Sequence, residues 1–240
     1  MKKHKHNPSY IHHNKETNIS TIRELVFGME DGMVSTLGSV TGIAAATGDP
    51  FTTILAGLVI VAVESISMGV GSYLSSKSVR SIDERKLSEE REELEQYPKE
   101  EEAELVGMYV KAGWSPPLAK KMAEEAAQNE GLFLEEMALR ELKIIPDNLE
   151  IPLENGIVMG VSYVVGGAIP LLPYFFIDVL QSIGVSVTVT LIALFFLGAY
   201  IARFSKRSWI KSGLEMFTLA SAAALIGFVV GQIVEQTFIR

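Results

Sequence analysis

FTTILAGLVIVAVESISMGVGSYLS, from Phe51 to Ser75, contains one charged residue, Glu64. A helix needs about 20 apolar residues to cross the hydrocarbon core of a bilayer, so this stretch predicts a membrane-spanning helix. Four other runs are similarly long and apolar, at about Leu25–Thr47, Ile157–Ile177, Val185–Ala202 and Leu214–Val234. Five such runs in 240 residues predict an all-α membrane protein with five transmembrane helices, rather than a soluble protein with buried helices.

The charge of the chain is concentrated between the second and third of these runs. Residues 83–143 hold 17 acidic and 9 basic residues, which accounts for the whole net charge of −8. Within them, EEREELEQYPKEEEAEL (Glu89–Leu105) packs nine glutamates around one proline. Glutamate runs are usually solvated helix faces or disorder, so this density alone identifies no binding site.

The basic residues predict how the chain is threaded through the membrane. Five lie in residues 2–23 and four in RFSKRSWIK (203–211), whereas the links TGDPF and Ile177–Gly184 contain none. Short basic segments stay in the cytoplasm, which places the N-terminus and the acidic insert inside and the C-terminus outside. No cleavable signal pattern precedes the first run. We expect a multi-pass protein of a prokaryotic plasma membrane.

Cysteine is absent, and all four histidines (His4, His6, His12 and His13) lie in the first thirteen residues. The body of the chain therefore has no disulfide framework, no thiolate metal site and no Ser-His-Asp chemistry. It also lacks a nucleophile motif and a phosphate-binding loop. We expect no enzyme, no prosthetic group and no nucleic-acid partner. The tail is expected to be disordered or tag-like, the alternative being that its histidines gather metal.

The acidic insert is predicted to be a compact unit of helices. They cover about Ser81–Gln96, Lys99–Ala112, Pro116–Asn129 and Leu132–Leu142. Pro98, Gly113 and Pro146 separate them, and Ser115 is expected at the N-cap of the third. Nine apolar side chains are expected to supply a small core: Leu94, Leu105, Val106, Met108, Leu118, Met122, Leu132, Phe133 and Leu139.

Acidic residues within membrane spans are costly and are therefore candidates for function. Asp31 follows Glu30 on the first span, and Glu64 lies 14 residues into the second, about 20 Å deep. Met68 lies one turn after Glu64, and a thioether beside carboxylates favours softer transition metals over magnesium or calcium. Met29 and Met33 are further candidate ligands. The plainer alternatives are an interfacial position for the Glu30–Asp31 pair, helix pairing for Glu64, and packing for the methionines.

Three pairs of side chains in the insert share helix faces, as metal ligands on facing bundle helices do. They are Glu90 with Glu93, Glu101 with Glu104, and Met137 with Glu141. The histidine of a Glu-x-x-His motif is missing, which disfavours ferritin-like di-iron chemistry.

Glycines on the first span form two patterns of small residues spaced four apart. They are Gly28 with Gly32 and Gly38 with Gly42. Such spacing lets helix backbones approach closely, so this span is predicted to pack at a helix–helix or dimer interface.

In its order of features the chain resembles the vacuolar iron transporter family from about Arg23 onward. The most specific parts are DGM at Asp31, ISMGVGSYLSSKS (Ile66–Ser78), the glutamate-rich insert and YVVGGAIPLLPYFF (Tyr163–Phe176). The resemblance implies a homodimer with five spans per chain and a cytoplasmic helical metal-binding domain inserted between spans two and three. It also implies that Fe²⁺ is collected there, passed along a dimer-interface path and exchanged for protons. Mn²⁺, Zn²⁺ and Co²⁺ are further expected ions.

Carried over residue by residue, the resemblance implies six cytoplasmic ligands: Glu90, Glu93, Glu101, Glu104, Met137 and Glu141. In the membrane it implies Asp31 and Met68. The family's glutamate on span two falls on Ile60 here, so either Glu64, one turn later, takes over its role or the ion is handled differently. The expected domains are a polar tail (1–22), spans one and two (23–80), the metal-binding domain (81–146) and spans three to five (147–240).

These observations lead to the hypothesis of a proton-coupled exporter of Fe²⁺ from the cytosol. Two alternatives stay open. One is a membrane sensor or storage protein that binds metal and transports nothing, and the other is a structural membrane protein with an acidic interaction domain.

Overall fold

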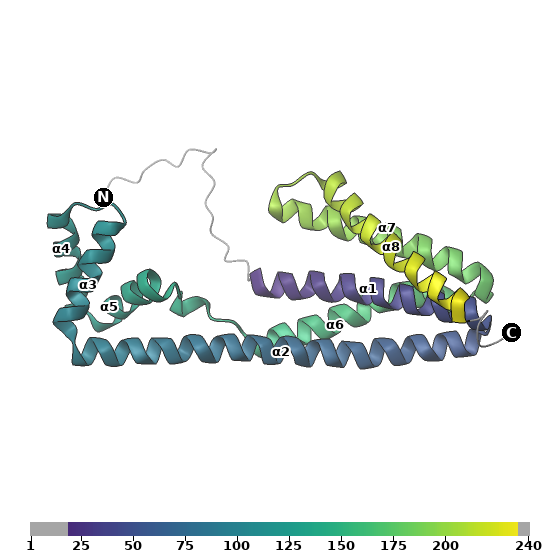
Figure 1. Cartoon of the computed structure of the whole chain (residues 1–240), viewed down its shortest axis with the longest axis horizontal. Coiled ribbons are helices and arrows are strands. Elements are labelled where there is room, and N and C mark those ends of the chain that lie inside the picture. Colours follow the sequence, from purple (N-terminus) through teal and green to yellow (C-terminus); the bar gives the residue numbers. More distant parts are fainter. Residues whose placement is uncertain (1–18, 235–240) are drawn as a thin grey trace, which may run out of the picture. The chain divides into compact units, whose positions relative to one another are not determined.

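The computed structural model describes residues 19–234 and folds them into helices and the turns between them, with no strand in that range (Figure 1). The long helices are α1 (Ile19–Thr47), α2 (Pro50–Gln96), α6 (Pro152–Leu171), α7 (Val179–Ser205) and α8 (Trp209–Val234). Shorter ones are α3 (Pro98–Lys111), α4 (Pro116–Ala126) and α5 (Glu130–Met137). Single turns are η1 (Ala138–Leu142), η2 (Pro146–Asn148) and η3 (Leu172–Phe175). The histidine-bearing tail lies outside the described residues.

The predicted all-helical class is confirmed, and so is the presence of membrane-length helices. Among the described residues, three helical segments are long and apolar enough to cross a bilayer: Pro50–Gln96, Pro146–Phe175 and Val179–Arg203. They correspond to the second, third and fourth predicted spans. Helices α1 and α8, at the first and fifth, are not among the three, so the count of five spans stays a prediction.

The chain divides into two compact units, one made of the residues up to Met68 and from Val158 onward, the other of Gly69–Ile157. In the first unit α1, α7 and α8 pack on one another (Figure 1). The fully buried Met33 of α1 lies in a core with Leu194 and Leu197 of α7. Helix α2 continues from this unit into the second without a break.

Two glycines of the α1 pattern, Gly28 and Gly32, pack against another helix of the same chain. A Cβ at Gly28 would lie 2.6 Å from the backbone oxygen of Met159, and one at Gly32 would collide with that of Tyr163. Both neighbours belong to α6, so these two glycines allow α1 and α6 to approach closely.

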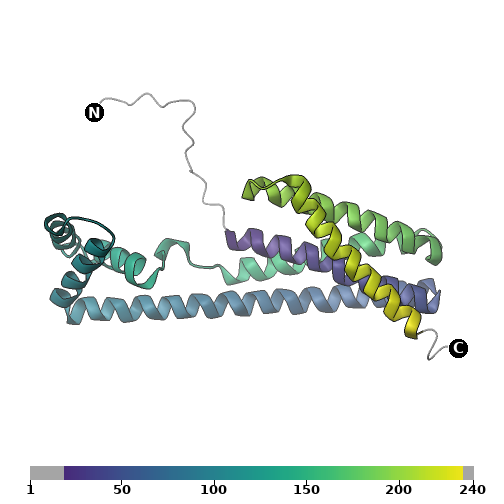
Figure 2. The same ribbon diagram turned by 45° about the horizontal axis from the view of Figure 1, so that its top comes forward.

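The second unit contains the predicted insert, with α3, α4 and α5 gathered at the C-terminal end of α2 (Figure 2). Its core holds Leu94, Leu105, Tyr109, Ala119, Ala123, Ala126, Phe133 and Met137. The expected core positions Leu118, Leu132 and Leu139 are wrong, because these side chains are exposed. Helix α4 turns its alanines inward instead.

Proline and glycine mark the limits of α3 and the start of α4 close to where the sequence predicts, whereas α4 ends at Ala126 rather than about Asn129 and α5 begins at Glu130 rather than Leu132. Pro98 and Pro116 are the first residues of α3 and α4, and Gly113 adopts a φ of +104° between them, a conformation that suits glycine. Ser115 occupies the N-cap of α4, although its side chain makes no capping hydrogen bond. Asn129 caps α5, where its side chain accepts a hydrogen bond from the Leu132 backbone at 3.1 Å.

Candidate metal site

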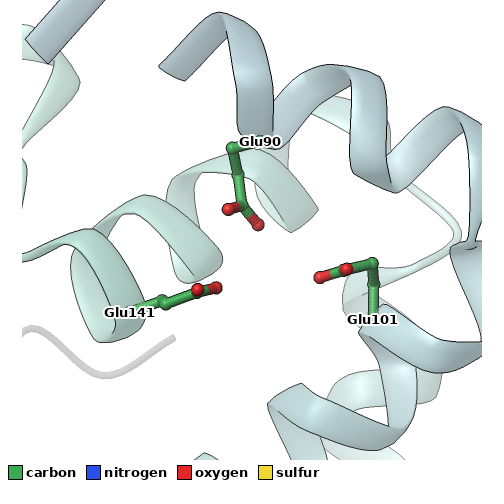
Figure 3. Close-up of side chains that lie close together, drawn as sticks. All are labelled: Glu90, Glu101 and Glu141. Atoms are coloured by element: carbon green, nitrogen blue, oxygen red, sulfur yellow. The ribbon is translucent and has the colours of Figure 1, made fainter. Parts of the chain in front are cut away.

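Three glutamates from three separate elements converge in the insert. Glu90 comes from α2, Glu101 from α3 and Glu141 from η1, and their side chains point toward one another (Figure 3). One carboxylate oxygen of each lies within 4.8 Å of the other two. Three hard oxygen donors at this separation form an arrangement that a divalent cation can bridge.

Two of these carboxylates are buried, and each has one oxygen without a hydrogen-bond partner in the described part of the chain. Glu90 is 3% exposed and Glu101 is 8% exposed. Glu90 Oε1 and Glu101 Oε2 are buried and have no hydrogen-bond partner among the described residues. A buried polar atom that lacks a partner costs about 1–3 kcal/mol, more when the group is charged. A bound cation would supply the missing interaction for both.

The surroundings raise the pKa of all three carboxyl groups. Burial, reinforced by the charges of Glu141, Glu101, Glu93 and Glu104, raises the pKa of Glu90 to about 7. Burial and the neighbouring glutamates likewise raise the pKa of Glu101 and of Glu141. When protonated, Glu90 donates a hydrogen bond to Glu141, which partly opposes the rise for that group. Protons and a metal ion would therefore compete for the same oxygens.

The other three sequence-predicted ligands of the insert lie in different surroundings. Glu93 and Glu104 are exposed, and their charges act on Glu101 and Glu141. Met137 is fully buried in the apolar core of the unit. The structure thus brings three of the six together as a cluster, with two more glutamates adding negative charge nearby.

Mutual repulsion makes the cluster expensive when all three groups are ionised. Two ionised carboxylates whose nearest oxygens lie within 4.8 Å repel by about 3 kcal/mol or more at an effective dielectric constant near 20. The helices that carry them are fixed by the apolar core below, in which Leu94 of α2 and Leu105 of α3 pack with Phe133 of α5. Packing of the apolar core therefore holds like charges together against their repulsion. This arrangement favours a ligand-binding role over a solvated surface.

Replacing Glu90 by Gln is expected to change stability and binding in opposite directions. The neutral amide removes repulsion, so the apparent Tm of the metal-free chain should rise by about 2–4 °C at pH 7.5. The same change removes a ligand, so affinity for Mn²⁺ should fall about tenfold or more. Differential scanning fluorimetry and calorimetry on the full chain in detergent measure the two effects.

Glu95→Gln is the matched control, since Glu95 is an exposed glutamate on the same helix. Equal Mn²⁺ affinity in the two variants would show that Glu90 has no special role.

The membrane candidates lie in the first unit. Asp31 on α1 is half-buried, and Glu64 on α2 is exposed. The two are close enough for their charges to interact. Met68, one turn after Glu64, is half-buried, whereas Met29 and Met33 pack in or against the α1–α7 core.

The sequence did not predict the role of three side chains near Glu141, namely Tyr109, Glu136 and Arg140. The Tyr109 hydroxyl donates to Glu136 at 3.0 Å, and Arg140 Nε donates to the same oxygen at 2.7 Å. The Arg140 guanidinium also lies 4.3 Å from the centre of the Tyr109 ring. A sequence signal existed, because Glu136 and Arg140 are spaced four apart.

Membrane-length apolar helices and a cluster of three carboxylates, two of them buried, define an integral membrane protein with a candidate cation site. The model of the VIT family matches residues 22–232, and the chain belongs to this family.

Several relatives are similar over most of their length. Vacuolar iron transporter 1 of Oryza sativa subsp. japonica is 31% identical over 220 residues, which cover 89% of this chain and 87% of the relative. Vacuolar iron transporter 1 of Tulipa gesneriana is 32% identical over 212 residues, covering 87% and 86%. The vacuolar iron transporter of Plasmodium falciparum is 29% identical over 241 residues, covering 96% and 88%. The family consists of transporters rather than enzymes, which agrees with the expectation from the sequence.

Proposed function

We propose that this protein exports Fe²⁺ from the cytosol in exchange for protons, with Mn²⁺, Zn²⁺ and Co²⁺ as further cargo. In this proposal the acidic insert is cytoplasmic and collects the ion, and Asp31, Glu64 and Met68 bind it during passage. The observation that carries the proposal is the pair of buried carboxylates at Glu90 and Glu101, each with one buried oxygen that has no hydrogen-bond partner among the described residues. It is supported by similarity to relatives that are named iron transporters.

Competition between protons and metal links the site to proton exchange. A carboxylate that is protonated in one state and metal-bound in another changes its charge state with each cycle. The ligand set of the insert would be Glu90, Glu93, Glu101, Glu104, Met137 and Glu141. Carboxylate oxygens alone suit Mn²⁺ as well as Fe²⁺, whereas a thioether from Met137 would shift the preference toward softer ions.

A homodimer with five spans per chain is part of the proposal. Glu64 is exposed on α2, and its neighbours Val63 and Ile66 are exposed and apolar. A carboxylate at membrane depth normally faces protein or water rather than lipid. A second copy of the chain, packed against this face, would give Glu64 such an environment.

The membrane in which the protein works is also part of the proposal. The sequence leads to a prokaryotic plasma membrane, whereas the relatives are named vacuolar transporters. Both placements export iron from the cytosol, so the mechanism is the same in either.

Metal flux in proteoliposomes tests the function. Vesicles with an acidic lumen and the full chain in their membrane should accumulate Fe²⁺, because protons leaving the lumen drive the ion inward. Accumulation should stop when an ionophore collapses the pH gradient. Stoichiometric binding without flux would instead identify a sensor or storage protein, and the absence of both would identify a structural one.

Binding of Mn²⁺ to the full chain in detergent should weaken as the pH falls. With a pKa of about 7 in the metal-free state, Glu90 is mostly protonated at pH 5.5 and mostly ionised at pH 8. Displacing this one proton makes binding about 30-fold weaker at pH 5.5 than at pH 8. The metal-free chain should instead become more stable as the pH falls. The reason is that the raised pKa of Glu90 in the folded state favours folding at low pH.

Calorimetry at both pH values measures the effect, and Glu90→Gln should show a flatter pH profile. An affinity that does not change with pH would rule out proton competition at this site.

A further inference from the structure

The last turn before the insert ends is a π-helix, η1, which carries Glu141. Such turns are rare, and they are frequently found at functional sites. At its end Lys143 adopts a φ of 60°, and its ammonium group donates a hydrogen bond to the Arg140 backbone oxygen. The backbone that presents Glu141 therefore departs from the helix that precedes it and needs side-chain contacts to fix its direction.

Those contacts come from Tyr109, Glu136 and Arg140, which together form an anchor. Tyr109 belongs to α3, the helix that also carries Glu101, whereas Arg140 directly precedes Glu141 in η1. Arg140 and Tyr109 both donate to Glu136 Oε2, and the guanidinium lies over the tyrosine ring. The anchor thus connects α3, which carries Glu101, to η1, which carries Glu141.

We infer that the Tyr109–Glu136–Arg140 anchor is a positioning device that holds Glu141 against Glu90 and Glu101 before the metal arrives. This inference rests on the proposed function of the cluster as a metal site. Without the anchor, repulsion among the three carboxylates would drive Glu141, the exposed member, away from the buried pair. The anchor therefore preorganises the site, as outer contacts do for metal ligands elsewhere.

Because Arg140 is positively charged, positioning of Glu141 can be distinguished from a direct effect of that charge on cation binding. If Arg140 acted only through its charge, removing it would make the surroundings more negative and cation binding tighter. If it positions Glu141, removing it frees the π turn and makes binding weaker. The two readings predict opposite signs for one substitution.

The test measures Mn²⁺ affinity of the full chain in detergent by calorimetry, with metal-free Tm recorded for each variant. Arg140→Met should weaken binding about tenfold, the lower end of the range for outer contacts of metal sites. Tyr109→Phe keeps the ring and every charge and removes one hydrogen bond, so it should weaken binding by a smaller factor, about threefold. Arg85→Met is the matched control, since Arg85 forms an exposed ion pair with Glu89 at 3.4 Å on α2; it should leave affinity nearly unchanged.

A double-mutant cycle with Glu141→Gln separates positioning from a general loss of structure. If Arg140 acts through Glu141, then Arg140→Met should have little further effect in the Glu141→Gln background. An unchanged or tighter affinity in Arg140→Met, or an equal loss in both backgrounds, would overturn the inference. Failure of the wild-type chain to bind Mn²⁺, or an effect-free Glu141→Gln, would instead refute the cluster as a metal site. Tyr109→Phe keeps the inference testable should Arg140→Met fail to fold.

Discussion

Replacing Asp31 by Ala is expected to lower pH-driven Fe²⁺ accumulation in proteoliposomes by about 100-fold, which corresponds to a barrier higher by about 2.7 kcal/mol. Asp31 is half-buried on α1 and interacts with the charge of Glu64. A divalent cation loses most of its water inside a membrane protein, so each carboxylate that replaces this water lowers its energy there. Removing one of two such groups should therefore nearly stop passage.

The measurement uses a metal-sensitive dye inside vesicles, with equal amounts of wild-type and variant protein inserted. Met68→Ala should show a smaller loss, about tenfold, because a thioether is a weaker ligand than a carboxylate. Glu30→Ala is the matched control, since Glu30 is the preceding residue and is also half-buried. Full flux in Asp31→Ala with lost flux in Glu30→Ala would show that the neighbouring carboxylate carries the ion. Full flux in both would remove this part of α1 from the path.

The limits of α3 and the start of α4 were predictable because they depend on local chemistry, whereas the end of α4 and both limits of α5 differ from the prediction. Proline cannot continue a helix that precedes it, and glycine accepts a positive φ, so Pro98, Gly113 and Pro116 mark helix ends without reference to the rest of the fold. Membrane-length helices were predictable for a similar reason, since length and apolar character are enough to identify them.

The composition of the glutamate cluster was less predictable. Spacing of three residues shows that Glu90 and Glu93 share a helix face, but the angle at which two helices cross decides which of them points at a third element. Here Glu90 and Glu101 are buried, whereas Glu93 and Glu104 are exposed. These angles arise from packing of the whole core, which no single segment encodes.

The position of Glu141 depends on a feature with no clear sequence signature. The sequence predicts one helix over residues 132–142, yet its last turn is a π-helix. An extra residue in a turn rotates every later side chain, so the direction of Glu141 cannot be read from its distance to Met137. The sequence also did not identify the partner of Gly28 and Gly32. Their spacing predicts a close neighbour but does not show that this neighbour is α6.

The second large expected effect on Fe²⁺ flux concerns the glutamate of α2, which lies one turn later than the resemblance implies. The resemblance to the vacuolar iron transporter family places a glutamate at position 60, where this chain has Ile60, and Glu64 stands one turn later. Positions four apart lie on nearly the same face of a helix, about 6 Å apart along its axis. If Glu64 has taken over the role, Glu64→Gln should lower Fe²⁺ flux about 30-fold, because the amide neither binds the cation as strongly nor takes up a proton.

The double substitution Ile60→Glu with Glu64→Gln then decides between replacement and a different mechanism. Recovery of at least a third of wild-type flux would show that the path accepts a carboxylate at either turn. The single substitution Ile60→Glu controls for the effect of a new charge at position 60, where the side chain is half-buried. Normal flux and normal pH dependence in Glu64→Gln alone would mean that Asp31 serves without a partner on α2. In that case proton exchange in this chain would have to depend on other carboxylates.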